Sequence, residues 1–278
     1  MQTYRELLKK GIELLKQAEI PSAEFDAKLL LMHTCSLTTS QLLAKINEKA
    51  ENFDKFLELI EKRANRFPLQ YILGEWEFWG RDFSVGEGVL IPRADTETLI
   101  ETALPLVANI QNPKILDLCS GSGCIAATLA LEIDNSEVLA VELSDKAYNY
   151  LTTNIKRNKA FNVTPILCDA CEYEPPHPLD LIVSNPPYIK TDVLASLQDE
   201  VQFEPSMALD GSDDGLYFYR TFVERYKNHL KSGGYFAFEI GFDQADDVVN
   251  ILQQAGFLSI KVIKDLSGCD RVVVARKA

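Results

Sequence analysis

The sequence predicts an α/β protein in which a small bundle of helices is followed by a doubly wound parallel sheet. Apolar residues recur at helical spacing through residues 1–66, and from about residue 93 short apolar runs alternate with amphipathic segments. Alternating strands and helices are typical of a parallel sheet with helices on both faces. Between these parts, residues 67–92 are aromatic, β-branched and interrupted by glycines, which indicates a β-hairpin or an extended linker.

The N-terminal helices are predicted from apolar residues that recur every three or four positions. Leu7 and Leu15 mark one face of the first helix, and Pro21-Ser22 precede the second. Further helices are expected over about 39–48 and 51–65. These short helices are expected to form a small bundle.

The C-terminal part, residues 93–278, contains seven candidate strands and five candidate helices. A short turn, DLSGCD, joins the last two strands, so one of them is expected to run antiparallel. The strands cover 114–118, 137–142, 164–168, 179–184, 234–240, 257–263 and 270–276. The helices lie near 94–108, 122–133, 145–158, 214–231 and 243–255.

Composition and charge narrow the class of protein. The 278 residues are 46% hydrophobic, enough for a sizeable core, and no apolar run is long enough to span a bilayer. The first residues are charged throughout and lack an apolar signal region, so we expect a cytoplasmic protein that binds no membrane. We also expect a monomer. The net charge of −13 falls mostly in residues 93–278. It opposes binding to nucleic-acid phosphates and favours a protein partner.

Neither the cysteines nor the histidines are spaced as metal ligands. Cys168 and Cys171 form one C-x-x-C pair without a second pair, so small buried thiols are favoured over a redox or zinc site. The three histidines lie far apart in the sequence. We therefore expect no metal.

A glycine-containing loop follows the first strand of the C-terminal part. The strand ends at Asp117, and Cys119–Gly123 then turn the chain into an alanine-rich helix, whose exposed N–H groups can hold an anionic group. Glu142, at the end of the next strand, can accept hydrogen bonds from ribose hydroxyls, and Asp169, after the third, can accept from an adenine amine. These strand ends predict a pocket for an adenosine-bearing cofactor.

The loop alone does not decide which cofactor is bound. Gly121-x-Gly123-x-x-Ala126 also satisfies the looser dinucleotide fingerprint, so a nicotinamide enzyme and a methyltransferase both fit. A tight strand–helix turn without a ligand is the third interpretation, and the two acids in register make it the weakest.

A second motif, Asn185-Pro186-Pro187-Tyr188, follows the fourth strand and suits transfer to a planar amide nitrogen. Such a nitrogen is a poor nucleophile and carries two N–H donors. The Asn185 side-chain oxygen can accept one and the Pro186 main-chain oxygen the other, while the Tyr188 ring packs on the flat target group. The stiff Pro-Pro backbone keeps these acceptors aligned, so catalysis would rest on positioning.

This motif, placed beyond such a loop, resembles the S-adenosylmethionine-dependent amino-methyltransferases, which include DNA and protein-glutamine enzymes. Longer stretches are similar to the peptide chain release factor glutamine methyltransferase family. They are Pro68–Gly74 with Phe78–Gly80, Val89–Arg93 with Asp95–Glu97, Glu204-Pro205 with Ala208–Gly211 and Asp214–Leu216, and Glu239–Gly241 with Lys264–Gly268 and Asp270-Arg271.

The resemblance implies a seven-stranded, Rossmann-like methyltransferase domain and a helical N-terminal domain that recognises the substrate. It also implies methylation of the glutamine in the Gly-Gly-Gln motif of class 1 release factors, giving N5-methylglutamine and S-adenosylhomocysteine. The expected cofactor-binding residues are Asp117, Cys119, Ser120, Gly121, Ser122, Gly123, Glu142, Asp169, Ala170 and Asn185. The expected catalytic residues are Asn185, Pro186 and Tyr188, and Pro187 and Phe78 are expected to join them in binding the target.

Three positions depart from the family pattern. Cys119 stands where glycine is frequent, Glu142 where aspartate is frequent, and Ser206 where arginine is usual. None of these removes a group that the chemistry needs, and Ser206 is expected to alter a surface contact with the substrate.

Other functions stay open at this point. A DNA amino-methyltransferase shares Asn185–Tyr188 but needs a basic groove, which the net charge of −13 argues against. A glutamine methyltransferase acting on a ribosomal protein shares almost every motif. A nucleotide-dependent dehydrogenase or a non-catalytic binding module leaves Asn185–Tyr188 unexplained. Two roles are also open: Phe78 lines the target pocket or packs in the hairpin, and Arg93 pairs with Glu97 or contacts the substrate.

Overall fold

The computed structural model describes residues 2–50 and 52–278, which form two compact units. One unit comprises the chain up to Glu75 together with Gln198–Phe203, and the other comprises Trp76–Leu197 and Glu204–Ala278. The second unit is thus interrupted by a six-residue segment that belongs to the first. No helix among the described residues is long and apolar enough to cross a membrane.

The first unit is the predicted helical bundle. Its helices are α1 (Tyr4–Gln17), α2 (Ala23–Cys35), α3 (Thr39–Lys45), α4 (Phe53–Ala64) and α5 (Leu69–Leu73). Residue 51, where the fourth helix was expected to begin, lies outside the described residues. Helix α5 corrects the expectation of extended chain after residue 67. Pro68 fixes its start and Gly74, with φ +77°, ends it, which is the usual placement of these residues at helix ends.

A buried ion cluster joins the bundle to the segment Gln198–Phe203. The Arg63 guanidinium donates to Asp26 at 2.7 Å and to Glu200 at 3.0 Å. Arg63 and Asp26 are both almost fully buried, so each charge depends on the other. The segment is therefore held to the bundle by charge as well as by the edge-on contact of Phe67 with Phe203.

The predicted hairpin is formed by β1 (Glu75–Phe78) and β2 (Arg81–Ser84). Trp79 and Gly80, the two turn residues, both have positive φ, which matches the twist of a tight hairpin. Phe78 and Phe83 from the two strands are buried in the core of the second unit.

The second unit is a seven-stranded sheet with the order β5-β4-β3-β6-β7-β9-β8. Strand β9 runs antiparallel to both neighbours, which confirms the expectation for the last pair. The strands are β3 (Lys114–Leu118), β4 (Glu137–Glu142), β5 (Val163–Leu167), β6 (Leu179–Ser184), β7 (Leu230–Glu239), β8 (Leu258–Lys264) and β9 (Asp270–Arg276). The helices are α6 (Glu97–Val107), preceded by the 3-10 turn η1 (Ala94–Thr96), α7 (Cys124–Glu132), α8 (Asp145–Asn158), α9 (Tyr217–Tyr226) and α10 (Ala245–Gln254).

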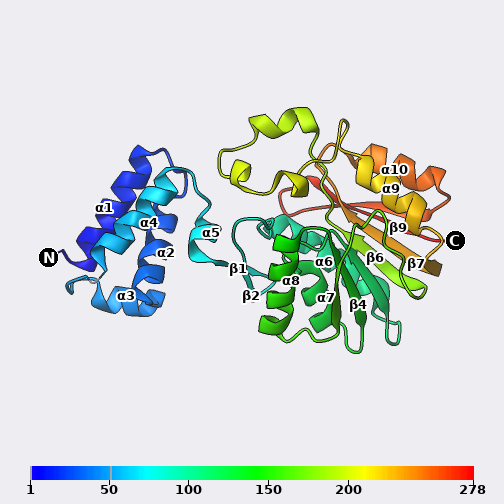
Figure 1. Ribbon diagram of the computed structural model, residues 1–278, viewed down its shortest axis with the longest axis horizontal. Coiled ribbons are helices and arrows are strands. Elements are labelled where there is room, and N and C mark those ends of the chain that lie inside the picture. The colour runs from blue at the N-terminus through cyan, green and yellow to red at the C-terminus, as the bar shows by residue number, and fades with distance from the viewer. Residues whose placement is uncertain (1, 51) are drawn as a thin grey trace. The chain divides into compact units, whose positions relative to one another are not determined.

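Helices cover both faces of this sheet, as the alternation predicted (Figure 1). Residues of α6, α7 and α8 form one buried apolar layer against the sheet, and residues of α9 and α10 form the other. Helix α9 ends five residues earlier than expected because β7 begins at Leu230, so the chain has already turned into the next strand.

The strand order reverses between β3 and β6. The chain runs outward from β3 through β4 to β5 and then returns to place β6 beside β3, with Leu118 opposite Ser184. The Ser184 hydroxyl donates to the Leu118 carbonyl at 2.6 Å and ties the two strand ends together. In doubly wound sheets, ligands bind outside the carboxyl ends of the strands at such a point. This edge is therefore where a site is expected.

Candidate active site

The loop after β3 has the conformation that its glycines suggested. Cys119, Gly121 and Gly123 all have positive φ, and the Ser120 hydroxyl donates to the Asp117 carbonyl at 3.0 Å. Gly123 has φ +80°, which favours glycine, and a Cβ there would also lie 2.5 Å from the Leu151 side chain of α8. The loop ends where α7 begins, at Cys124.

Glu142 closes the loop from the end of β4. Its carboxylate accepts hydrogen bonds from the Gly121 and Ser144 N–H groups, each at 2.8 Å. The residue is 8% exposed, and burial raises the pKa of its carboxyl group. The structure thus brings together two motifs that lie 21 residues apart, and lone pairs of the carboxylate remain for hydroxyl donors.

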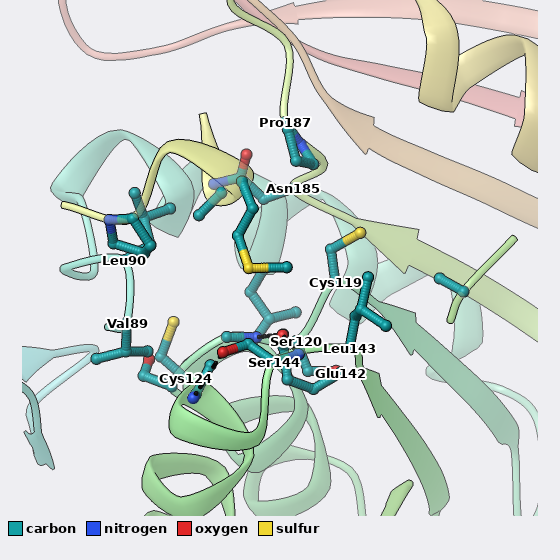
Figure 2. A pocket seen from close by; sticks show the side chains of 18 of the residues that line it. Val89, Leu90, Cys119, Ser120, Cys124, Glu142, Leu143, Ser144, Asn185 and Pro187 are labelled. Carbon is teal, nitrogen blue, oxygen red and sulfur yellow. Dashed lines mark hydrogen bonds between the residues drawn. The ribbon is translucent and has the colours of Figure 1, made fainter. Parts of the chain in front are cut away.

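A pocket of about 920 Å³, including its open mouth, lies at this edge of the sheet. Figure 2 shows Val89 and Leu90 on one side, the Glu142–Ser144 segment on another, and Asn185 with Pro187 above Cys119 in this view. Its size suits a nucleoside-bearing ligand. The lining includes most of the expected cofactor residues: Cys119, Ser120, Gly121, Ser122, Glu142, Asp169, Ala170 and Asn185.

Two walls of this pocket were not expected from the sequence. Residues 88–93 and the segment Pro205–Ala208 both line it, although they were noted only as parts of a family resemblance. Glu204 joins the two walls: its buried carboxylate accepts from the Ile91 N–H at 2.9 Å and pairs with Arg93. Arg93 therefore pairs with Glu204, whereas Glu97 accepts from the Trp79 N–H.

The acceptors at the pocket suit S-adenosylmethionine. Glu142 faces it with a carboxylate suited to ribose hydroxyls, and the Asp169 carboxylate, which also lines it, accepts the Cys171 N–H at 2.7 Å. Asp117 lies fully buried beneath the loop and does not line the pocket. Neither of its carboxyl oxygens has a hydrogen-bond partner within the described chain, and burial raises its pKa to about 7. A cationic ligand above the loop would stabilise its ionised form.

Asn185 stands at the end of β6 with an oriented amide. Its Nδ2 group donates to the Thr96 hydroxyl at 3.3 Å, which leaves Oδ1 to accept from a ligand. Pro187 also lines the pocket, whereas Pro186 is buried and Tyr188 packs against the core layer of α9 and α10. Burial raises the pKa of the Tyr188 hydroxyl, so this group is neutral near pH 7.

The backbone of the second motif is braced by a glycine loop. The Gly211 N–H donates to the Ile189 carbonyl at 2.7 Å, and the Gln244 side chain donates to the carbonyls of Tyr188 at 3.0 Å and Gly215 at 3.1 Å. These contacts join segments that are 22 to 56 residues apart in the sequence. They hold the backbone that follows the two prolines in place.

The comparisons with known proteins agree with this geometry. Residues 6–74 match the family model of the PrmC N-terminal domain, and residues 95–201 match that of the methyltransferase small domain. The chain is 41% identical to a release factor glutamine methyltransferase of Clostridium botulinum, over 98% of this chain and 99% of that protein. It is 40% identical to one of Fusobacterium nucleatum, over 98% of this chain and 78% of that protein.

The chain belongs to the release factor glutamine methyltransferase family. It is accordingly an S-adenosylmethionine-dependent methyltransferase, and S-adenosylmethionine is its cofactor. Among solved structures, the hMettl16 catalytic domain in complex with a MAT2A 3′UTR hairpin aligns over 80% of this chain and 79% of that chain. The TM-score is 0.57 at 14% identity, which shows a shared fold.

Phe78 corrects the expectation that it binds the target. It is 1% exposed, meets the Phe83 ring edge-on at 6.1 Å between centroids, and does not line the pocket. Its position on the inward face of β1 places it in the core, as the alternative interpretation held. An aromatic run in a hairpin does not reveal which of its members point inward.

None of the cysteines is paired in a disulfide among the described residues. All six are free, and within residues 2–50 and 52–278 no three His, Cys, Asp or Glu side chains gather as metal ligands. Burial is the largest cause that raises the pKa of the Cys119 thiol well above its usual value and that of Cys171 to about 11. Both thiols are therefore neutral and poorly nucleophilic near pH 7.

Replacing Cys119 with glycine is expected to change the affinity for S-adenosylhomocysteine less than about threefold. Removing the side chain relieves a left-handed conformation, φ +60°, that costs a non-glycine residue about 1 kcal/mol. Cys119→Val, with a β-branched side chain at the same φ and in the pocket wall, is expected to weaken binding at least about tenfold. Calorimetric titration of both variants measures this, and equal affinities would show that the position tolerates any side chain.

Replacing Gly211 with alanine is expected to lower kcat for methyl transfer by about tenfold, with the Kd for S-adenosylhomocysteine unchanged. The added Cβ would lie 2.8 Å from Tyr188 Cα and 2.9 Å from the Pro187 oxygen, so the motif backbone must shift. Gly256→Ala is the control, because its Cβ meets nothing within 4 Å although its φ of +84° makes the change destabilising. A normal kcat in Gly211→Ala would show that the brace does not position the motif.

Proposed function

We propose that this protein transfers the methyl group of S-adenosylmethionine to the side-chain amide nitrogen of the glutamine in the Gly-Gly-Gln motif of class 1 peptide chain release factors. The products would be N5-methylglutamine and S-adenosylhomocysteine. The observation that carries the proposal is the Asn185 amide, which meets the cofactor pocket with its oxygen available. Membership of the release factor glutamine methyltransferase family supports the choice of substrate.

The residues of the motif act mainly by positioning. The Asn185 oxygen accepts one N–H of the target amide and the Pro186 main-chain oxygen accepts the other, which aims the nitrogen lone pair at the methyl group. When bound, the cofactor supplies an electrophilic methyl group, because the C–S bond breaks with its electron pair on sulfur and the leaving thioether is neutral. As positive charge develops on the target nitrogen, both acceptors bind its hydrogens more strongly. One N–H proton then leaves to solvent, so no strong general base is needed.

Glu142, Asp169 and the loop Cys119–Gly123 are proposed to hold the cofactor, with Ala170 beside the adenine. Asp117 contributes from beneath the loop, through the unsatisfied charge that a cationic ligand would balance. Val89 and Leu90 provide an apolar part of the pocket wall (Figure 2). Tyr188 is proposed to contribute through its packing beside the target.

The same proposal covers the roles of the domains, the location of the enzyme and its oligomeric state. Residues 1–66 recognise the substrate protein, residues 67–92 form the linker, and residues 93–278 carry the chemistry. The enzyme is a cytoplasmic monomer that binds neither membrane nor nucleic acid, and its net charge of −13 supports the last point. Sedimentation analysis of the free enzyme tests whether it is a monomer.

The test is methyl transfer from labelled S-adenosylmethionine to unmethylated release factor. Wild-type factor and a factor whose Gly-Gly-Gln glutamine is replaced by alanine are compared in parallel. Label on the wild-type factor alone is expected. Absence of label on both, with S-adenosylhomocysteine still bound by the enzyme, would overturn the substrate and make ribosomal proteins the next candidates.

A further inference from the structure

Two buried polar residues that the reaction does not use, Thr96 and Glu239, lie beside Asn185. Thr96, at the junction of η1 and α6, is 2% exposed and accepts the Asn185 Nδ2–H. Glu239, at the end of β7, is 1% exposed, and the pairing of Ser184 with Phe238 places it beside Asn185. Thr96 lies close enough to the Glu239 carboxyl for its hydroxyl to lower the pKa of that group. The three residues therefore lie beside one another, with Asn185 and Thr96 in the wall of the pocket and Glu239 outside its lining.

The hydrogen-bonding capacity of each group decides which of the three residues donates and which accepts. A threonine hydroxyl has one proton to donate and two lone pairs, whereas an ionised carboxylate can only accept. While Glu239 is ionised, the Thr96 proton is committed to it, so Thr96 can only accept from Asn185. The Asn185 amide must then turn its NH₂ toward Thr96 and its oxygen toward the pocket. The reverse amide orientation would offer the target an N–H donor instead of an acceptor.

We propose that Thr96 and Glu239 are positioning residues, which fix the side-chain amide of Asn185 with its oxygen toward the target nitrogen. This inference rests on the proposed function only in giving Asn185 a target amide to bind. The orientation itself is a property of the protein without any substrate, so it can be measured separately. Buried polar residues with a purely structural role would not need to donate and accept in this particular order.

We call the series Glu239, Thr96 and Asn185 the relay. The surroundings of Glu239 make the relay sensitive to pH. Burial raises the pKa of this carboxyl to about 7, and the Thr96 hydrogen bond acts in the opposite direction. One carboxyl oxygen, Oε2, has no partner within the described chain. Protonated Glu239 can donate to Thr96, which frees the Thr96 proton to donate to the Asn185 oxygen. Other charged and titratable groups that act on Glu239 or feel it are Arg93, Asp95, Cys124, Tyr188, Tyr219 and Arg271.

The sign of the pH effect follows from the raised pKa. Glu239 is ionised above about pH 7, where the relay has one direction, and it takes up a proton as the pH falls. The kcat for methyl transfer is therefore expected to decline as the pH falls through about 7. In Glu239→Gln the group at this position cannot titrate, so this limb should disappear from the profile.

The test uses full-length enzyme with Thr96→Val, Thr96→Ser and Glu239→Gln. Thr96→Val is nearly isosteric but cannot hydrogen-bond, and its kcat is expected to fall about tenfold with KM and the Kd for S-adenosylhomocysteine within about twofold. Thr96→Ser restores the hydroxyl and is expected to recover kcat to within about threefold. If Thr96→Val does not fold, the Ser and Gln variants decide through the pH profile. A wild-type profile in Glu239→Gln, or full kcat in Thr96→Val, overturns the relay.

A second readout is independent of activity. In ¹⁵N-labelled free protein, the Asn185 side-chain NH₂ resonance is assigned by its absence from Asn185→Ala. It is expected to shift as the pH passes through about 7 in wild type, to stay constant in Glu239→Gln, and to exchange faster with solvent in Thr96→Val. A resonance unchanged in all three proteins would overturn the relay even if the enzyme is active. Wild-type protein that shows the shift but does not methylate release factor would overturn only the proposed substrate.

Discussion

Replacing Asn185 with alanine is expected to lower kcat for methyl transfer to release factor by a factor of about 10²–10³. The side-chain oxygen at the end of β6 binds an N–H of the target, and this bond strengthens as positive charge develops on the nitrogen. Its loss therefore weakens the transition state more than the bound substrate. The measurement is single-turnover transfer of labelled methyl, together with calorimetric binding of S-adenosylhomocysteine, whose Kd is expected to change by less than about threefold.

A matched control separates this effect from the substitution itself. Asn250→Ala removes the same atoms from an exposed position on α10 and is expected to keep kcat within about twofold of wild type. A rise in KM with unchanged kcat in Asn185→Ala would contradict the role in the transition state. It would mean that Asn185 binds the substrate and the transition state equally.

The location of the site could be predicted from the sequence because it depends on where strands end. Runs of apolar residues predicted the positions of β3, β4 and β6. Because these strands are parallel, their carboxyl ends lie at the same edge of the sheet. Residues at or shortly after the ends of such runs, such as Gly121, Glu142 and Asn185, were therefore expected to lie near one another. The distinction between a dinucleotide enzyme and a methyltransferase needed the second motif, because the loop geometry is shared by both.

The support of the site could not be predicted in the same way, because it depends on packing between distant segments. Nothing local to Thr96 indicates that Asn185, 89 residues later, donates to it. Glu204 and Gly211 were noted only as parts of a family pattern, although they hold the pocket wall and the motif backbone. In the sequence, they are an acid and a glycine within a long segment that has no regular apolar periodicity, and such residues give no indication of what they contact. The prediction that Phe78 binds the target was wrong for a related reason, because an aromatic pattern does not distinguish a core position from a pocket position.

Replacing Glu142 with glutamine is expected to raise the Kd for S-adenosylhomocysteine by roughly 30- to 100-fold, which corresponds to about 2–3 kcal/mol. The carboxylate already accepts two N–H groups, from Gly121 and Ser144, and still has lone pairs for the ribose hydroxyls. A glutamine has one oxygen for these donors, and its NH₂ group faces either the loop or the ligand. Calorimetric titration measures the Kd, and thermal unfolding shows whether the loop still folds.

Glu142→Asp is the matched control, since it keeps the charge and both oxygens and shortens the side chain by one methylene. It is expected to stay within about fivefold of the wild-type Kd, because chain reach changes while the number of acceptors does not. The pH dependence gives a second criterion. Burial raises the pKa of Glu142, so its ionised form is lost at a higher pH than for an exposed glutamate, and cofactor affinity falls as the pH decreases through that range. Glu142→Gln should bind with a flatter pH dependence. If Glu142→Asp were as weak as Glu142→Gln, the length of the side chain rather than its charge would determine the affinity, and this chain would require the longer acid at the end of β4.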